Sequence, residues 1–306
     1  MDSGELHLFY EDLVRKLRNR GVVCAITSGL ACVHYGLAET TKDCDLLCHT
    51  GAFAELLTLL ADTRIDGIAC QYRGNISPPL DAKWHQGGWT SHFEWLTKPM
   101  PAKLDVFGHA LRESSPWTEE LFGLYASPHT VADMKKTDRG KDWDFVTGLG
   151  VRMIEADDER GWLHIFNGDT LCDLIEGREI PANLAEARPA LRFALERDRR
   201  MDAAIRGEQM FWEELDRRRI QILERVLRPY VSAVRKARFG RQLSLRDDHH
   251  VRIECANCCL PANPLKEYGL QHYIQEARAR LPDLGLIPDA LTWLPDVTKY
   301  FEWLNK

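Results

Sequence analysis

The sequence predicts an α+β fold in which a mixed β-sheet flanked by helices is followed by a mainly helical region. Two observations lead to this prediction. Up to about residue 155, short apolar runs with β-branched residues or two-residue alternation are interleaved with segments of helical periodicity. From about residue 129 onward, helical spacing of the apolar positions dominates, which is typical of a helical region packed around its own core.

The amino-terminal elements follow from the local pattern of apolar residues. Residues 1–21 place Leu6, Phe9, Leu13 and Leu17 on one stripe, which predicts an amphipathic helix. The segment GVVCAI is expected to form a buried strand, and the Ser28-Gly29 turn after it leads into a short helix that ends near Tyr35-Gly36. The further expected elements are a strand at 43–49, a helix at 51–63, and strands at 91–96 and 103–108.

A chain of 306 residues favours two domains, and we expect them at 1–155 and 156–306. The second contains a long helix from Arg206 to Arg241 that is rich in basic residues and bent at Pro229. A positive face on this helix could hold RNA by its phosphates. The more ordinary alternative is the exposed face of a helical bundle.

Charge, hydropathy and cysteine content limit the class of protein. The net charge is −6, so any attraction to nucleic acid must be local. No apolar run approaches the roughly 20 residues that span a bilayer, and the charged amino terminus does not resemble a signal peptide, so we expect no membrane partner. The nine cysteines are an odd number for a disulfide framework, which indicates a cytoplasmic chain with reduced thiols.

Three acids are candidates for a metal site. On a strand, Asp43 and Asp45 point to the same face, whereas Asp142 and Asp144, which have the same spacing, lie in a helical pattern and diverge. Asp105 is a lone acid in another apolar strand, where a carboxylate is costly to bury unless it is paired or binds a metal. Together the three acids could form a site suited to magnesium. The alternative for the Asp-Cys-Asp segment is a pair of solvated acids at the end of a strand.

The Ser28-Gly29 turn is a candidate phosphate site. It lies between a strand and the start of a helix, where backbone N–H groups point outward and the helix dipole favours an anion. An ordinary strand-to-helix turn has the same local pattern, so the turn alone does not decide between the two.

The combined segment SGLACVHYGLAETTKDCDLL resembles the signature of the DNA polymerase beta type nucleotidyltransferase superfamily. In that family a Gly-Gly or Gly-Ser pair opens a helix, an Asp-x-Asp follows on the next strand, and a third carboxylate lies on a later strand, which Asp105 matches. The spacing is similar to the bacterial branch of abortive-infection and toxin-antitoxin nucleotidyltransferases. A second segment, VADMKKTDRGKDWDFV, resembles the part of that branch with a Lys, a short gap, and then Arg and Lys-Asp. The likeness covers about residues 22–150.

This resemblance implies a nucleotidyltransferase fold and catalytic domain in residues 1–155 and an acceptor-binding or accessory role for 156–306. It implies two magnesium ions held by Asp43, Asp45 and Asp105, with Asp105 also taking the proton of the acceptor hydroxyl. Ser28 and Gly29 would contact the β and γ phosphates of a nucleoside triphosphate. The expected nucleotide-binding cations of the second segment are Lys135, Arg139 and Lys141, whereas Lys136 is expected to be solvated.

The sequence departs from the family pattern at two positions. Ser28 replaces the usual first glycine, and Glu39 stands where many relatives carry a basic residue. The acceptor is expected to be transfer RNA, a small hydroxylated molecule or a protein side chain, and a cognate antitoxin is a possible partner. The alternative is a non-catalytic nucleotide-binding or partner-binding module that keeps the scaffold. The preferred triphosphate and the oligomeric state are left open by the sequence.

One further segment, HHVRIECANCCL, contains potential zinc ligands. Its side chains of interest are His249, His250, Cys255, Cys258 and Cys259. Zinc prefers four ligands, and no second well-spaced pair accompanies the Cys-x-x-Cys. Buried free thiols near a turn are therefore the favoured interpretation.

Overall fold

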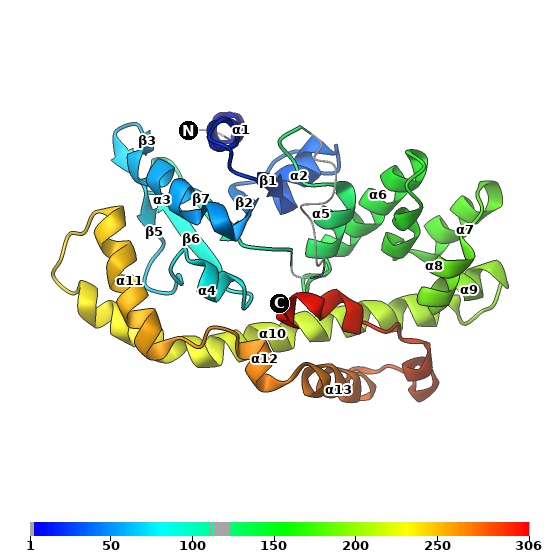
Figure 1. The fold of residues 1–306 in the computed structure, drawn as a ribbon. Helices are drawn as coiled ribbons and strands as arrows, with labels where there is room; N and C mark the ends of the chain where they lie inside the picture. The colour runs from blue at the N-terminus through cyan, green and yellow to red at the C-terminus, as the bar shows by residue number, and fades with distance from the viewer. Residues whose placement is uncertain (1–2, 111, 113–122, 306) are drawn as a thin grey trace. The chain divides into compact units, whose positions relative to one another are not determined.

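The computed structural model describes residues 3–110, 112 and 123–305 (Figure 1). The chain forms two compact units, and neither is a single continuous stretch. The first unit comprises Met1–Ser127, Ile222–Glu267 and Trp303–Lys306, and the second comprises Pro128–Gln221 and Tyr268–Glu302. The expected α+β class is confirmed. The division differs from the single expected boundary at residue 155, because residues 128–155 belong to the second unit and residues 222–267 return to the first.

A five-stranded mixed sheet forms the centre of the first unit. Its order is β1-β2-β7-β6-β5, in which β2 and β7 are parallel and the other neighbours are antiparallel. The strands are β1 (Cys24–Thr27), β2 (Asp43–Cys48), β5 (Gln71–Tyr72), β6 (Thr90–Trp95) and β7 (Ala102–Phe107). A separate two-stranded ladder joins β3 (Arg64–Ile65) to β4 (Ile68–Ala69).

The two faces of this sheet differ in polarity, as two-residue alternation predicts. Along β6 and β7, buried residues alternate strictly with partly exposed ones. Phe93 and Trp95 lie on the apolar face. The ring of Trp95 contacts Phe9 of α1 (Ser3–Asn19) edge to face, with the ring centroids 5.2 Å apart. Its indole N–H donates a hydrogen bond to the carbonyl of Thr63, which follows α3 (Phe53–Asp62). The opposite face carries Thr90, His92 and Glu94 of β6 and Lys103 and Asp105 of β7.

Helices complete the first unit around this core. The remaining elements of its first stretch are α2 (Ser28–His34), η1 (Thr50–Ala52) and α4 (Ala82–His85). From the later part of the chain, α11 (Leu245–Cys259) and the carboxy-terminal part of α10 (Met201–Arg238) add apolar residues to a shared cluster. Its buried members are Trp84, Trp89, Tyr230, Val234, Ala256 and Leu260. These long-range contacts explain why residues 222–267 belong to the first unit.

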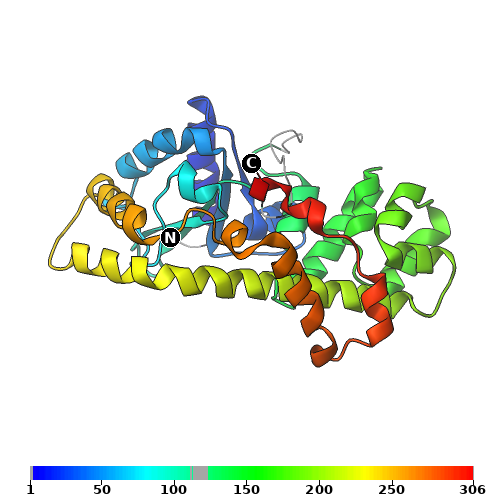
Figure 2. The same ribbon diagram turned by 60° about the horizontal axis from the view of Figure 1, so that its bottom comes forward.

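The regular secondary structure of the second unit is helical in the part that the structure describes. Its elements are α5 (Pro128–Met134), α6 (Asp142–Glu155), η3 (Glu159–His164), α7 (Gly168–Gly177), α8 (Ala182–Ala187), α9 (Pro189–Leu195), the first part of α10, α13 (Leu270–Arg280), η4 (Pro282–Leu284), η5 (Pro288–Trp293) and most of η6 (Thr298–Asn305). Between the units in sequence, α12 (Pro264–Tyr268) closes the returning segment. The expected long helix is confirmed, and α10 continues through Pro229 (Figure 2).

No helix in the described part of the chain has the length and apolar composition that a bilayer crossing requires.

The buried His85, which contacts Ser91 of β6, leads us to predict that the stability of the protein depends on pH. His85 is fully buried, its Nε2 lies 2.8 Å from the Ser91 hydroxyl, and burial, with smaller contributions from His109 and His92, lowers its pKa to about 3. In the unfolded state His85 binds a proton near the ordinary pKa of about 6.5. The buried, neutral His85 therefore costs no free energy of unfolding above that pH, and the free energy of unfolding falls as the pH is lowered from about 6.5 toward 3. We expect His85→Gln to flatten the pH dependence of urea unfolding between pH 4.5 and 7.5.

The matched control is His250→Gln, which changes an exposed histidine of the same unit. An unchanged slope of unfolding free energy against pH in His85→Gln would show that His85 is not the group responsible.

Candidate functional site

The three candidate carboxylates lie on one face of the sheet. In the strand register, Thr27 is paired with Asp45, Asp45 with Asp105, and Asp105 with His92. Residues paired directly across strands project to the same face, and Asp43 shares that face with Asp45 because it is two residues away. Asp43, Asp45 and Asp105 therefore project to the same face of the sheet.

Asp105 is held by two basic side chains. An Arg73 terminal nitrogen lies 2.8 Å from Oδ1 and 3.0 Å from Oδ2 of Asp105, and His92 Nδ1 lies 2.9 Å from Oδ1. Burial acts to raise the pKa of Asp105, but the contacts with His92 and Arg73 outweigh it, so the pKa lies below its usual value. Asp105 is thus a stabilised, ionised carboxylate, and the lowered pKa makes it a weaker base.

Asp43 is in a more open environment than Asp105. The side chain of Asp43 is half exposed, and one of its carboxylate oxygens lies 3.8 Å from Lys103 Nζ on the neighbouring strand. An ion pair that long and that exposed contributes little to stability. Asp45 is partly exposed between Thr27 and Asp105 in the row of paired residues. Asp43 is consequently the most exposed of the three acids, and Asp45 and Asp105 are both partly buried.

The donor chemistry fits magnesium, but the carboxylates do not form a ready cage. Carboxylate oxygens are the ligands that this ion prefers, and three of them share one face. Nevertheless, within the described residues no group of three or more His, Cys, Asp or Glu side chains is arranged to hold a metal ion. Asp43 and Asp45 could hold such an ion, whereas Asp105 directs both oxygens to Arg73.

The Ser28-Gly29 turn lies beside these acids, because Ser28 follows Thr27, the strand partner of Asp45. Ser28 opens α2 with a φ of 55°, a left-handed conformation that a residue other than glycine rarely adopts. A side chain at position 29 would place its Cβ 2.8 Å from Thr41 Oγ1, so glycine allows the turn to approach the loop before β2. Backbone strain of this kind occurs often at functional sites.

A cavity of about 200 Å³ adjoins this turn in the first unit. It is lined by Gly4, His7, Leu30, Val33, Glu39, Thr40 and Thr41. Glu39, one of the two departures from the family pattern, therefore lines a cavity rather than standing alone in a loop. Its negative charge disfavours a phosphate group there.

The expected nucleotide-binding cations lie in the second unit, where two of them share one acid. Lys135 is buried with its Nζ 3.1 Å from Asp142, and a terminal nitrogen of Arg139 lies 2.7 Å from the other oxygen of the same carboxylate. Lys141 is exposed. Because Lys135 is buried whereas the side chain of Arg139 is 55% exposed, Arg139 and Lys141 are the members better able to reach a phosphate.

The expectation that Lys136 is solvated is wrong. Only 1% of its surface is exposed, and its ammonium group lies 2.8 Å from Asp133 and over the rings of Phe166, Trp212 and Tyr300. Burial lowers its pKa, and the attraction of Asp133 offsets only part of that effect. Helical periodicity placed Lys136 away from Lys135 but could not show that tertiary contacts cover both sides of this segment.

The cysteine-rich segment forms most of α11. His249 Nδ1 lies 2.8 Å from the Tyr72 hydroxyl, and Cys258 is exposed while Cys255 and Cys259 are partly buried. The expected burial of these thiols holds in part, because Cys255 and Cys259 pack against the hydrophobic cluster that contains Trp84, whereas Cys258 is exposed.

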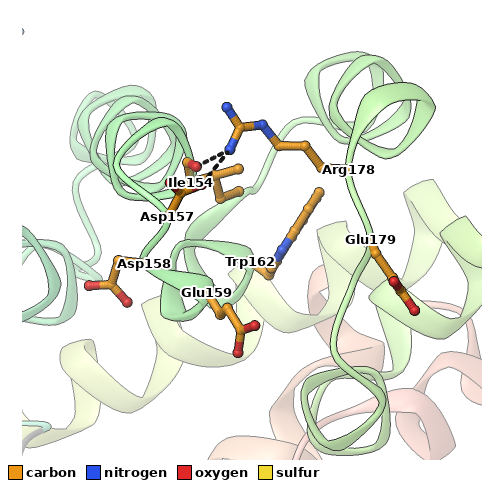
Figure 3. Close-up of a pocket in the computed structure, with 7 residues that line it drawn as sticks. All are labelled: Ile154, Asp157, Asp158, Glu159, Trp162, Arg178 and Glu179. Atoms are coloured by element: carbon orange, nitrogen blue, oxygen red, sulfur yellow. Dashed lines mark hydrogen bonds and ion pairs between the residues drawn. The ribbon is translucent and has the colours of Figure 1, made fainter.

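A pocket in the second unit has a different character (Figure 3). Its volume is about 260 Å³, and Arg178 reaches across it toward Asp157 and the Ile154 carbonyl (Figure 3). The other lining residues are Asp158, Glu159, Trp162 and Glu179. Four carboxylates around one guanidinium disfavour a triphosphate in this pocket.

Three residues of the carboxylate site, Arg73, His92 and Lys103, were not predicted from sequence. Alternation along 91–96 and 103–108 was sufficient to place His92 on the face opposite Phe93, and Lys103 on the face of Asp105. Arg73 follows a two-residue strand, for which no periodicity can be measured.

Comparison of the whole chain with known proteins gives no match to a family model, a curated protein or a solved structure.

Proposed function

We propose that the protein is a magnesium-dependent nucleotidyltransferase that moves a nucleoside monophosphate from a nucleoside triphosphate to an acceptor hydroxyl. The observation that carries this proposal is the row of paired residues in which Asp45 lies between the end of β1 and Asp105. That row sets Asp45 beside Asp105, and the Ser28-Gly29 turn directly follows Thr27, the partner of Asp45 on β1. The same combination is the basis of the likeness to the nucleotidyltransferase superfamily.

Each residue has a chemical role in this proposal. Asp43 and Asp45 would hold the magnesium ion, which when bound neutralises charge on the triphosphate. The Ser28 hydroxyl and the Gly29 backbone N–H donate hydrogen bonds to the β and γ phosphates. The acceptor oxygen forms a bond to the α-phosphorus, the bond from that phosphorus to the bridging oxygen breaks, and pyrophosphate leaves. Asp105 accepts the acceptor's proton.

The acceptor is best sought among both RNA and small hydroxylated molecules. The basic side chains of α10 are weaker evidence for an RNA acceptor than their number suggests, because several are paired with acids. Arg217 and Arg218 contact Glu214, Arg219 contacts Asp216, and Arg238 contacts Asp248. Paired arginines release fewer counterions from a nucleic acid, so a small acceptor stays a full alternative.

The reaction class is tested by the fate of two labels. We expect label in the α-phosphate of a triphosphate to appear on an acceptor in the presence of magnesium, and label in the γ-phosphate to appear in pyrophosphate. Each of the four triphosphates is incubated with transfer RNA and with hydroxylated small molecules. Transfer of the γ label to an acceptor would indicate a kinase, and retention of the α label in the triphosphate with every acceptor would oppose transferase activity.

A second candidate is a non-catalytic nucleotide-binding or partner-binding module. The pairing of Asp105 with Arg73 and His92 favours it, because a carboxylate committed to two basic groups is poorly placed for chemistry. Calorimetry with each triphosphate separates the candidates: heat of binding without transfer of either label supports the module.

A further inference from the structure

Arg73 is positioned by the sheet to reach Asp105. Its backbone N–H donates to the His92 carbonyl at 2.9 Å, which continues the β5–β6 ladder by one residue. His92 is in turn the strand partner of Asp105 on β7. The guanidinium group therefore extends over His92, with one terminal nitrogen 2.9 Å from His92 Nδ1, and ends against the Asp105 carboxylate.

The contact occupies the coordination capacity of Asp105. The same guanidinium nitrogen lies close to both carboxylate oxygens, and His92 adds a second neighbour at Oδ1. All three side chains are largely buried, with 20% to 25% of each exposed. In such a setting a carboxylate needs a cation, and removal of one partner leaves a costly unpaired charge. Arg73 supplies the positive charge that a divalent ion would otherwise supply.

We propose that Arg73 is a positioning residue that excludes a divalent cation from Asp105 in the nucleotide-free protein, so that the first cation binds at Asp43 and Asp45 alone. This inference rests on the proposed function, since it concerns the same carboxylates. A guanidinium group and a metal ion both require the oxygens of Asp105 and repel each other there. Phosphate is a strong alternative partner for arginine, so a bound triphosphate is the ligand that draws Arg73 away from Asp105.

Manganese binding, measured from the electron paramagnetic resonance signal of free Mn²⁺ without nucleotide, tests the inference directly. We expect Arg73→Gln to bind Mn²⁺ about tenfold more tightly than wild type, because Asp105 becomes available. Arg73→Lys retains the positive charge and should stay near the wild-type affinity. Arg64→Gln is the matched control, because it removes an exposed arginine of the same unit.

A second variant makes the test independent of the folding of Arg73→Gln. If Arg73 prevents Asp105 from coordinating the ion, Asp105→Asn should leave the Mn²⁺ affinity within about twofold of wild type. If Asp105 is already a ligand of the ion, the same substitution should weaken the Mn²⁺ affinity about tenfold or more. A tenfold loss in Asp105→Asn overturns the inference, as does an unchanged affinity in folded Arg73→Gln. Thermal unfolding of each variant shows whether it is folded.

The outcomes also separate this inference from the proposed function. The expected Mn²⁺ pattern without transfer of the α label contradicts the transferase alone. Transfer of the label with equal Mn²⁺ affinity in wild type and Arg73→Gln contradicts only the role of Arg73. Absence of Mn²⁺ binding in every variant contradicts both, because it removes the cation site itself.

Discussion

Asp45→Asn is expected to lower the initial rate of α-label transfer by about 100-fold or more, the effect typical of removing one preorganised electrostatic group. Asp45 lies between Thr27 and Asp105 in the strand register, so its carboxylate is next to both the Ser28-Gly29 turn and the third acid. The amide of asparagine keeps the shape but carries no charge, and it binds magnesium poorly in place of a carboxylate. The rate is measured at saturating triphosphate and magnesium.

The chain supplies a matched control in a second Asp-x-Asp. Asp144 of α6 is an exposed acid in that repeat, so Asp144→Asn removes one negative charge without touching the sheet. We expect Asp144→Asn to transfer label at the wild-type rate. Equal rates for wild type, Asp144→Asn and Asp45→Asn would show that Asp45 takes no part in the reaction.

Lys136→Ala is expected to reduce the free energy of unfolding of the second unit by about 3 to 5 kcal/mol, the usual cost of breaking a buried ion pair. Asp133 is only 1% exposed, and removal of the ammonium group 2.8 Å away leaves its carboxylate without its closest cation. The alanine also leaves a void beneath Trp212 and Phe166. Urea unfolding followed by tryptophan fluorescence measures the loss.

Two further variants identify the cause of that loss. Lys141→Ala removes an exposed lysine of the same unit and should leave stability within about 0.5 kcal/mol of wild type. The double variant Lys136→Met with Asp133→Asn removes both charges and keeps most of the volume, so we expect it to be more stable than Lys136→Ala. Equal stability of Lys136→Ala and Lys141→Ala would contradict the inferred importance of this pair.

The sequence by itself determined the local elements around the site. Two-residue alternation placed Asp43 and Asp45 on one face of a strand, and Asp105 opposite Leu104 and Val106. The Ser28-Gly29 position at the start of a helix also followed from local pattern, as did most of the long helix α10. These features depend on residues close together in the chain, which is the range over which periodicity and turn chemistry act.

Tertiary structure alone decided which of these elements meet. The parallel pairing of β2 with β7 set Asp45 beside Asp105, and the position of β6 brought His92 and then Arg73 to the same carboxylate. Burial of Lys136 and the return of residues 222–267 to the first unit are likewise products of long-range packing. Strand order, register and burial depend on contacts between distant residues, so they cannot be predicted from the periodicity within a single segment.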